Sequence, residues 1–239
     1  MVVSNRVILK DDGITFDSEW EMSIYAQGKQ FNRYPFDWVV STVNRLFRDP
    51  ADRASSSVVE LGSGAGNNLK FLLDFGFGSV HGIEGSRSAL SIAKDYLSDS
   101  SARLKLIEAD FRTIPAEDGE YALILDRGSI THNDLDSCRA ILAESFRVLR
   151  PGGYLISTLF SNLHSQIYTA SKIGPSFYRA FRDAAGVSTG LNTSFLTIKD
   201  VIDALQNFEI VSCVSDVKTE LIGPPAVTGM WYVIARKPA

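Results

Sequence analysis

Short apolar runs alternate with longer amphipathic stretches along most of this chain, and the alternation predicts the order of its strands and helices. Short runs that fit buried strands lie at 58–61, 80–84, 104–108, 121–126 and 154–159. Between them, apolar residues at helical spacing predict helices over 67–75, 88–97 and 135–149. Strands separated by helices of this length favour a parallel sheet that is covered by helices on both faces.

The N-terminal part of the chain is less regular. Residues 36–47 place apolar side chains at helical spacing after Pro35, which suits a first helical turn, and Asp49-Pro50 should end that helix. A polar connector over 51–57 follows. We therefore expect an N-terminal helical segment over 1–57 and the main domain over 58–239.

The rhythm breaks again after the fifth strand. Residues 160–195 mix aromatic and basic side chains without a strand-like run, and they predict a small helical cap inserted over the edge of the sheet. A helix over 198–205 then precedes two strands, near 209–217 and 231–236. The link between these strands is too short and too rich in Gly and Pro for a helical crossover, so the final pair should be antiparallel.

The most informative local motif is a buried strand that runs directly into a glycine-rich turn. Gly62, Gly64 and Gly66 let the backbone adopt positive φ and leave room for a ligand, and the helix that follows presents free N–H groups to a polar partner. Glu84 ends the next strand, where a carboxylate can accept both hydrogen bonds from a ribose diol. The motif predicts an adenosine-bearing ligand at the carboxyl ends of the first strands, the simpler alternative for the loop alone being a tight turn.

The same motif distinguishes between adenosine-bearing ligands. A dinucleotide fingerprint would place its third glycine at position 67, which is Asn67. Glu60, just before the turn, adds a negative charge that repels a pyrophosphate but suits a ligand with a sulfonium and an amino group. A nicotinamide-dinucleotide-dependent dehydrogenase is therefore the weaker alternative.

Four stretches resemble, in their order and spacing, the class I S-adenosylmethionine-dependent methyltransferases: 60–67, 82–86, 108–111 and 147–153. The resemblance implies a Rossmann-like α/β fold with a mainly parallel seven-stranded sheet, an antiparallel last strand and helices on both faces. It also implies S-adenosylmethionine as the cofactor. Residues 25–36 additionally resemble a branch of bacterial methyltransferases linked to surface-polysaccharide or other small-metabolite pathways.

The resemblance also implies how the cofactor is held. The glycine turn lies beneath the methionine part and the ribose, and Glu84 holds the ribose hydroxyls. Asp110 accepts from the adenine amine, unless it is only a turn cap, and Phe111 lines the adenine pocket. Asp126 or the main chain of Arg127 lies near the methionine amino group. The expected cofactor-binding set is Glu60, Gly62, Ser63, Gly64, Gly66, Asn67, Glu84, Gly85, Ser86, Asp110, Phe111, Asp126 and Arg127.

Residues 126–134 follow the fourth strand directly, where this fold meets the methyl acceptor. His132 is the best candidate for a general base because the ordinary pKa of histidine lies near neutral pH, and Asp126 is the second candidate for a catalytic role. The alternative is that His132 only helps to start the helix that follows. His164 is a weaker candidate base, and His81 is expected to be structural.

Two further segments bear on the acceptor. Residues 25–33 are expected to fold over the cofactor as a lid. The cap carries side chains that suit an anionic or nucleotide-linked acceptor, or else a solvated face: Tyr168, Lys172, Tyr178, Arg179 and Arg182. The leading hypothesis is O-methylation of a sugar or a hydroxylated metabolite. N- or C-methylation, the dehydrogenase, and a cofactor-binding protein without chemistry remain alternatives.

Composition changes this picture mainly by exclusion. The formal net charge is −4 and no block of basic residues occurs, which argues against nucleic acid as a partner. No apolar stretch is long enough for a signal peptide or a membrane span, so we expect a cytoplasmic protein without a membrane partner. The 2 cysteines and 3 histidines are scattered, and no metal site is expected. The chain should act as a monomer or a homodimer.

Overall fold

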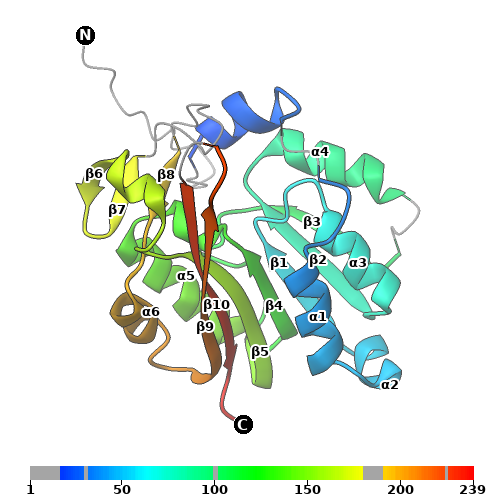
Figure 1. Ribbon diagram of the computed structural model, residues 1–239. Coiled ribbons are helices and arrows are strands. Elements are labelled where there is room, and N and C mark those ends of the chain that lie inside the picture. The colour runs from blue at the N-terminus through cyan, green and yellow to red at the C-terminus, as the bar shows by residue number, and fades with distance from the viewer. Residues whose placement is uncertain (1–16, 30–31, 99–101, 180–190, 224–225) are drawn as a thin grey trace.

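The computed structural model describes residues 17–29, 32–98, 102–179, 191–223 and 226–239. A seven-stranded sheet with the strand order β3-β2-β1-β4-β5-β10-β9 runs through the molecule (Figure 1). Its strands are β1 (Ser57–Leu61), β2 (Ser79–Glu84), β3 (Leu104–Glu108), β4 (Tyr121–Arg127), β5 (Leu149–Phe160), β9 (Glu209–Glu220) and β10 (Ala226–Arg236). The five shorter apolar runs of the sequence thus all form strands of one sheet.

The direction of the strands follows from their connections. Strands β3, β2, β1, β4 and β5 pair in parallel. The last strand, β10, is antiparallel to both of its neighbours, with Trp231 opposite Leu159 of β5 and Ser215 of β9. The predicted sheet, mainly parallel with an antiparallel last strand, is therefore confirmed.

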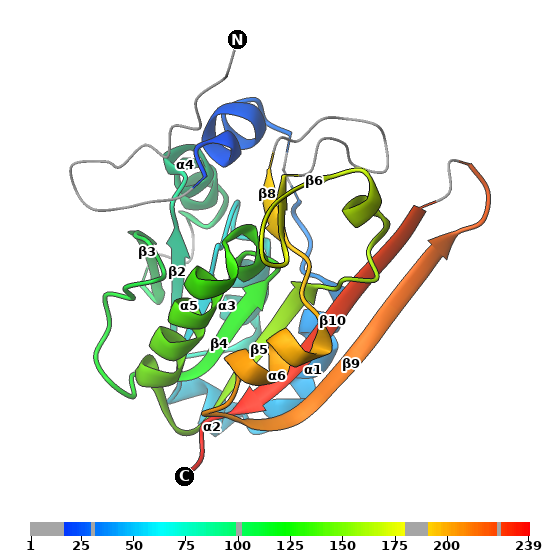
Figure 2. The same ribbon diagram turned by 90° about the vertical axis from the view of Figure 1, so that its left-hand side faces the viewer.

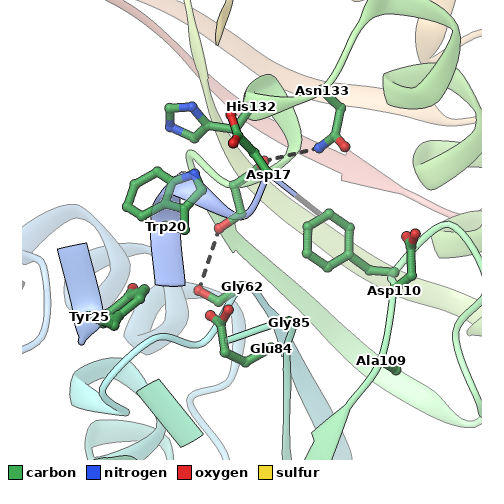
Figure 3. Close-up of a pocket in the computed structure, with 12 residues that line it drawn as sticks. Asp17, Trp20, Tyr25, Gly62, Glu84, Gly85, Ala109, Asp110, His132 and Asn133 are labelled. Carbon is green, nitrogen blue, oxygen red and sulfur yellow. Dashed lines mark hydrogen bonds between the residues drawn. The ribbon is translucent and has the colours of Figure 1, made fainter. Parts of the chain in front are cut away.

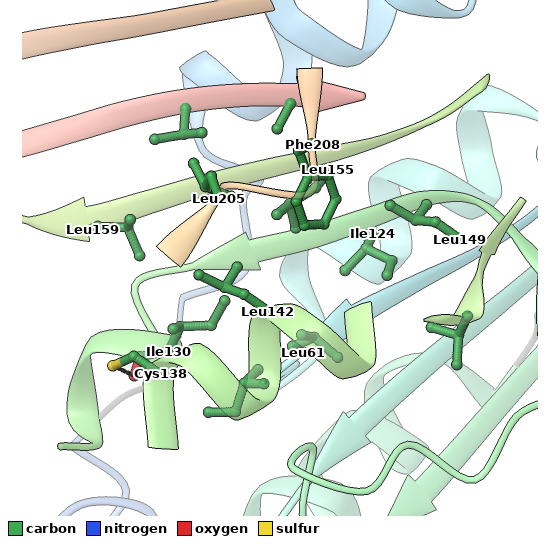
Figure 4. Packing of buried hydrophobic residues seen from close by; sticks show 14 of the residues in the cluster. Leu61, Ile124, Ile130, Cys138, Leu142, Leu149, Leu155, Leu159, Leu205 and Phe208 are labelled. Carbon is green, nitrogen blue, oxygen red and sulfur yellow. Dashed lines mark hydrogen bonds between the residues drawn. The ribbon is translucent and has the colours of Figure 1, made fainter. Parts of the chain in front are cut away.

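Helices cover both faces of the sheet, as Figure 2 shows from the side. They are α1 (Asp37–Leu46), α2 (Pro50–Ala54), α3 (Asn67–Phe75), α4 (Arg87–Tyr96), α5 (Leu135–Val148) and α6 (Ile198–Ala204). Apolar residues of α1 and α3 share one buried cluster with the sheet, and those of α5 and α6 share another. Figure 4 shows the second cluster, in which Leu142 and Leu205 pack against Ile124 and Leu155. The sheet is therefore buried on both faces, as a parallel sheet requires.

One N-terminal element differs from expectation. The polar connector expected over 51–57 is wrong in its first part, because Pro50–Ala54 forms the short helix α2. The Asp49 carboxylate accepts a hydrogen bond from the Ala51 N–H at 2.8 Å, and Pro50 occupies the first turn. The dipeptide that ends α1 therefore also starts a new helix, since Asp is a good N-cap and Pro suits the position after it.

The described part of the cap is built mainly from strands, so the expectation of a helical cap over 160–195 is wrong for those residues. Its described part holds a single 3-10 turn at Ser165–Tyr168 and a three-stranded antiparallel sheet, β6 (Ser171–Gly174), β7 (Phe177–Arg179) and β8 (Asn192–Ser194). The turn between β6 and β7 contains Pro175, and Ser176 adopts a φ of 52° there. A proline and a left-handed residue both interrupt a helix, which is why the aromatic residues after them join a strand.

In the described part of the chain, no helix is both long enough and apolar enough to cross a membrane. The carboxyl ends of β1, β2, β3 and β4 all lie at one edge of the sheet, with the short N-terminal helical turn Trp20–Tyr25 beside them (Figure 1). The first four parallel strands therefore direct the loops that follow them toward one place.

Candidate functional site

The glycine turn after β1 needs its glycines. Gly62, Gly64 and Gly66 have φ values of 66°, 52° and 87°, which side-chain-bearing residues rarely adopt. A Cβ atom on Gly62 would lie 2.0 Å from the Ser129 hydroxyl oxygen, and one on Gly64 would lie 2.6 Å from the Tyr25 hydroxyl. The turn therefore brings the loop after β4 and the N-terminal turn Trp20–Tyr25 into close contact with its backbone.

Glu84, at the end of β2, is fixed by the same turn. One carboxylate oxygen accepts a hydrogen bond from the Gly64 N–H and the other from the Ser86 N–H, both at 2.9 Å. Burial raises the pKa of the Glu84 carboxyl group, whereas these backbone hydrogen bonds oppose the rise. The carboxylate is thereby held in one orientation between the glycine turn and the start of α4.

A cavity of about 630 Å³, its open mouth included, lies at the carboxyl ends of the first four parallel strands. This is the place where α/β sheets bind ligands, because the strand order reverses between β1 and β4. Figure 3 shows its lining, in which loops of the sheet face the N-terminal turn. The lining residues are Asp17, Trp20, Tyr25, Gly62, Glu84, Gly85, Ala109, Asp110, Phe111, Ser129, His132 and Asn133.

Six residues named from the sequence line this cavity: Gly62, Glu84, Gly85, Asp110, Phe111 and His132. Asp110 also accepts a hydrogen bond from the Arg112 N–H at 2.9 Å and pairs with the Arg112 guanidinium group. Asp110 therefore caps the turn, as the alternative interpretation expected, and it also lines the cavity. Local motifs thus identified the side of the cavity formed by the strand ends.

Glu60 lies behind the turn rather than in the lining. Its side chain is buried, one oxygen accepts from the Asn68 amide at 2.6 Å, and the other has no partner in the described part of the structure. Burial raises the pKa of Glu60 to about 8, and the negative charges of Asp126 and Glu84 act in the same direction. The Ser63 hydroxyl is likewise buried and unpartnered among the described residues.

These unpartnered atoms test whether the predicted cofactor fits. Buried polar atoms are nearly always hydrogen-bonded in folded proteins, so two beside one turn without a partner among the described residues are unusual, but neither lies in the cavity lining. The Glu84 carboxyl group and the open backbone of Gly62 both face the cavity, and the carboxyl group favours a ligand with positive charge. The residues present therefore fit S-adenosylmethionine, which carries a sulfonium and an amino group.

Asp126 and Arg127 are not in the lining. The Asp126 carboxylate is fully buried and accepts hydrogen bonds from the Ser157 hydroxyl at 2.6 Å and from the N–H groups of Ser129 and Ile130 at 2.8 and 3.1 Å. Burial raises the pKa of Asp126 to about 6. The Arg127 guanidinium lies 4.2 Å from the centre of the Phe36 ring. Asp126 therefore fixes the loop that carries His132.

The remaining predicted cofactor residues support the site from outside the lining. The Asn67 amide donates to the Tyr34 carbonyl oxygen at 2.9 Å, and Gly66 precedes the first turn of α3. The Ser86 hydroxyl caps α4 by accepting from the Ala89 N–H at 3.0 Å. These residues set the positions of α3 and α4, whose first turns flank the cavity.

His132 ends a 3-10 turn, Ile130–His132, and its orientation is well defined. Its Nδ1 lies 3.0 Å from the Asn192 carbonyl oxygen, which can only accept, so Nδ1 carries the proton and Nε2 keeps a lone pair. Burial lowers the pKa of His132, although the Asn192 carbonyl and the Asp17 charge oppose this. The cap of α5 is Asp134, whose carboxylate accepts from the Ser137 N–H at 2.8 Å. The alternative role, in which His132 starts α5, is therefore wrong.

The other histidines are engaged in structural contacts. His164 Nδ1 accepts from the Gln166 N–H at 3.2 Å and caps the 3-10 turn of the cap, and its ring packs against Phe160. His81 Nδ1 lies 2.8 Å from the Tyr121 hydroxyl. Neither His164 nor His81 lines the cavity.

The N-terminal wall of the cavity was missed from the sequence, apart from Tyr25. Asp17 and Trp20 precede any periodic pattern. Ala109, Ser129 and Asn133 lie in the stretches 108–111 and 126–134, which the sequence singled out, but were not predicted as site residues. The Glu21 carboxylate holds this wall against α4, accepting from the hydroxyl groups of Ser86 and Ser88, each at 2.5 Å. The only sequence signal for this wall was a tryptophan among acidic residues at 17–21, in a segment without a periodic apolar pattern.

Comparisons with known proteins agree with this geometry. Residues 58–153 match a family model described as a methyltransferase domain. An S-adenosylmethionine-dependent methyltransferase from Methanosarcina mazei is similar in structure, with a TM-score of 0.66 and 20% identity over 86% of this chain and 99% of that chain. A similar protein from Anabaena variabilis gives a TM-score of 0.61 and 17% identity over 92% and 94% of the two chains.

A third solved structure is the 1,6-didemethyltoxoflavin-N1-methyltransferase of Burkholderia thailandensis with bound 1,6-didemethyltoxoflavin and S-adenosylhomocysteine. It has a TM-score of 0.67 and 16% identity over 91% of this chain and 85% of that chain. A search of curated proteins finds no match in sequence. The structural likenesses show the fold, and the family model covers the residues that form the glycine turn and the strand ends around it. Residues 58–153 form a methyltransferase domain, and the sheet that contains them has the fold of the S-adenosylmethionine-dependent methyltransferases that the chain resembles.

Proposed function

We propose that this methyltransferase transfers the methyl group to a hydroxyl oxygen of a small molecule, with His132 as the general base. The observation that carries the proposal is the fixed tautomer of His132, whose Nδ1–H donates to the Asn192 carbonyl at 3.0 Å while the ring lines the cavity. A neutral imidazole with a lone pair on Nε2 suits the removal of a hydroxyl proton.

When bound, S-adenosylmethionine supplies a methyl carbon that is already activated by its sulfonium group. The chain's own residues have two tasks, which are to align the acceptor and to take its proton. With the cofactor bound, the acceptor oxygen would take the methyl carbon, sulfur would keep the electron pair of its former bond to that carbon, and Nε2 of His132 would take the hydroxyl proton. The lowered pKa of His132 keeps the ring neutral, and therefore ready to accept this proton, at neutral pH.

The cofactor roles belong to the same proposal. Glu84 holds the ribose hydroxyls, Asp110 and Phe111 take the adenine, and the turn at 62–66 supports the methionine part. The cavity supports this division, because Asp110 and Phe111 follow β3 whereas the turn follows β1. Asp126 acts as a positioning residue for the loop of His132, since its oxygens already accept three hydrogen bonds.

The cavity itself favours a small acceptor. The site is a concave space lined by rings and short loops, which suits a small molecule rather than a macromolecule. The dehydrogenase alternative is disfavoured because the Glu84 carboxyl group faces the cavity, and no lysine or arginine among the described residues lines it to bind a pyrophosphate. N-methylation remains the second candidate, since a neutral imidazole can also take a proton from an ammonium acceptor.

The proposal is tested by replacing His132 with Gln, which can still donate to the Asn192 carbonyl but is not a base. Transfer of labelled methyl groups from S-adenosylmethionine to a panel of hydroxylated small molecules should fall by about 100-fold or more. The dissociation constant for S-adenosylhomocysteine should stay within about twofold of the wild type, because cofactor contacts are untouched.

The matched control is His164→Gln, a second buried histidine of the same region that is not in the lining. Its transfer rate should stay near that of the wild type. Unchanged turnover in His132→Gln, or an equal loss of cofactor binding and turnover, would show that His132 is not the base.

A further inference from the structure

The cavity has two unlike sides. The ends of β1, β2 and β3 contribute glycine backbone and the carboxylates expected to hold the cofactor. The opposite side consists of Asp17 and Trp20 from the N-terminal segment and of His132 and Asn133 from the loop after β4, as Figure 3 shows. This second side, Asp17, Trp20, His132 and Asn133, is called the acceptor wall below.

The acceptor wall is partly aromatic. The indole ring of Trp20 lies edge-to-face with the imidazole of His132, with ring centres 4.9 Å apart. Phe160 also packs against His132, with ring centres 5.7 Å apart. Aromatic rings prefer other rings as edge-to-face or offset-stacked partners, so a wall that contains Trp20 favours an aromatic ring over a flexible or heavily hydrated molecule.

A fixed carboxylate completes the wall. Asp17 accepts from the Asn192 side-chain amide at 3.2 Å and from the Asn192 N–H at 3.4 Å, while Glu19 N–H donates to its other oxygen at 3.1 Å. Asn192 is the residue whose carbonyl orients His132. The carboxylate therefore sits beside the base, its position is set by three hydrogen bonds, and it faces the same cavity.

Positive side chains are absent from the lining as far as the described residues go. Asp17, Glu84 and Asp110 contribute carboxylates to the cavity, and no lysine or arginine does. The cap residues expected to meet an anionic acceptor are not in the lining. Lys172 is exposed, with its ammonium 5.9 Å from the Tyr178 ring centre. Arg179 lies behind the wall, where it donates at 3.3 Å to the side chain of Asn192, the partner of Asp17. Arg182 lies outside the described residues.

We propose that Asp17 and Trp20 are specificity-determining residues of the acceptor wall, which takes a flat, hydroxylated ring that carries no negative charge. Trp20 contacts the ring face or edge, and Asp17 attracts a cationic or hydrogen-bond-donating substituent while repelling an anionic one. This inference rests on the proposed function, because it assumes that the methyl acceptor binds against this wall. The sequence suggested an anionic or nucleotide-linked acceptor, whereas the wall favours a neutral or cationic one.

The test uses three probes that share one hydroxylated ring and differ in charge: 5-hydroxytryptophol (neutral), serotonin (cationic) and 5-hydroxyindole-3-acetate (anionic). Their binding to the full chain is measured by calorimetry with and without saturating S-adenosylhomocysteine. We expect the neutral and cationic probes to bind at least about tenfold more tightly than the anionic probe. Asp17→Asn keeps an acceptor oxygen for Asn192 and should reduce the cation-to-anion ratio by about fivefold or more.

Three further variants separate a binding role from a structural one. Trp20→Ala should weaken all three probes by about five- to tenfold, and Trp20→Phe should restore most of that loss. Glu19→Gln removes a negative charge from the same segment outside the lining, where the Glu19 carboxylate accepts from the Ser23 hydroxyl at 2.6 Å, and should leave the ratio unchanged.

Equal or tighter binding of the anionic probe overturns the inference, as does an unchanged ratio in Asp17→Asn or a lack of binding by every probe. Transfer of labelled methyl groups to the same probes is recorded separately. If the charge order holds but His132→Gln transfers methyl groups as fast as the wild type, the proposed base is wrong while the acceptor wall stands.

Discussion

Glu60 should make the folded protein less stable as the pH rises, and this effect can be measured without any ligand. The side chain is buried behind the glycine turn, with one oxygen bonded to Asn68 and the other unpartnered among the described residues. Its pKa is raised from 4.5 to about 8, chiefly by burial. The folded state therefore keeps a proton that the unfolded chain has already released. Glu60→Gln keeps the shape of the protonated acid but cannot titrate.

The sign and size of the effect follow from proton linkage. Between pH 4.5 and about 8 the folded state binds more protons than the unfolded state at this group, so stability falls as the pH rises. The slope is about 1.4 kcal/mol per pH unit, and the full loss over this window is about 5 kcal/mol. From about pH 6 to about pH 7.5, Glu60 alone should lower the free energy of unfolding by about 2 kcal/mol.

The assay is urea unfolding of the wild type and of Glu60→Gln at these two pH values. Other buried carboxyl groups titrate in both proteins, so the difference between the two slopes isolates Glu60. Glu209→Gln, at the exposed start of β9, controls for the substitution itself and should keep the wild-type slope. Parallel pH dependence in the wild type and Glu60→Gln would refute the reasoning, because it would mean that the buried carboxyl group titrates as it does in the unfolded chain.

Three further predictions concern the turn, the base and the loop after β4. Gly64→Ala should weaken S-adenosylhomocysteine binding by about tenfold or more in calorimetry, because the added methyl group would lie 2.6 Å from the Tyr25 hydroxyl. The control is Gly28→Ala, at a φ of 65° with open space around it. This variant carries only the backbone strain and should leave binding unchanged. The pH profile of kcat/KM should show an acidic limb at a pKa below 6.5, because burial lowers the pKa of His132 and protonation removes the base; a limb that persists in His132→Gln would contradict this. Asp134→Ala should cost about 1 kcal/mol in urea unfolding by removing the cap of α5, and a loss of turnover without a loss of stability would point to another role.

The strand-end side of the site could be predicted from the sequence because it is local. The turn at 62–66 and Glu84 each follow an apolar run directly, so the strand brings the ligand-facing group with it. The parallel sheet then places these strand ends side by side, independently of the conformation of the loops. The antiparallel pairing of the last two strands could be predicted for the same reason, because the length and composition of the link between β9 and β10 decide their relative direction.

The acceptor wall could not be predicted in this way. His132 is oriented by Asn192, sixty residues away, and that contact exists only because β8 lies beside the loop after β4. Trp20 and Asp17 come from a segment without periodicity, held against α4 by Glu21. Such long-range contacts leave no spacing pattern in the sequence. The oligomeric state, the compartment and the division of the chain at position 57 stay predictions.

The central claim is that the turn at 62–66 and Glu84 bind S-adenosylmethionine. Calorimetric titration of the wild type and of Glu84→Ala with S-adenosylmethionine and with a nicotinamide dinucleotide tests it most directly, with thermal unfolding as the check that the variant is folded. We predict saturable binding of S-adenosylmethionine by the wild type, no binding of the dinucleotide, and an affinity at least about tenfold weaker in Glu84→Ala. Binding of the dinucleotide alone, or equal S-adenosylmethionine affinity in a folded Glu84→Ala, would contradict it.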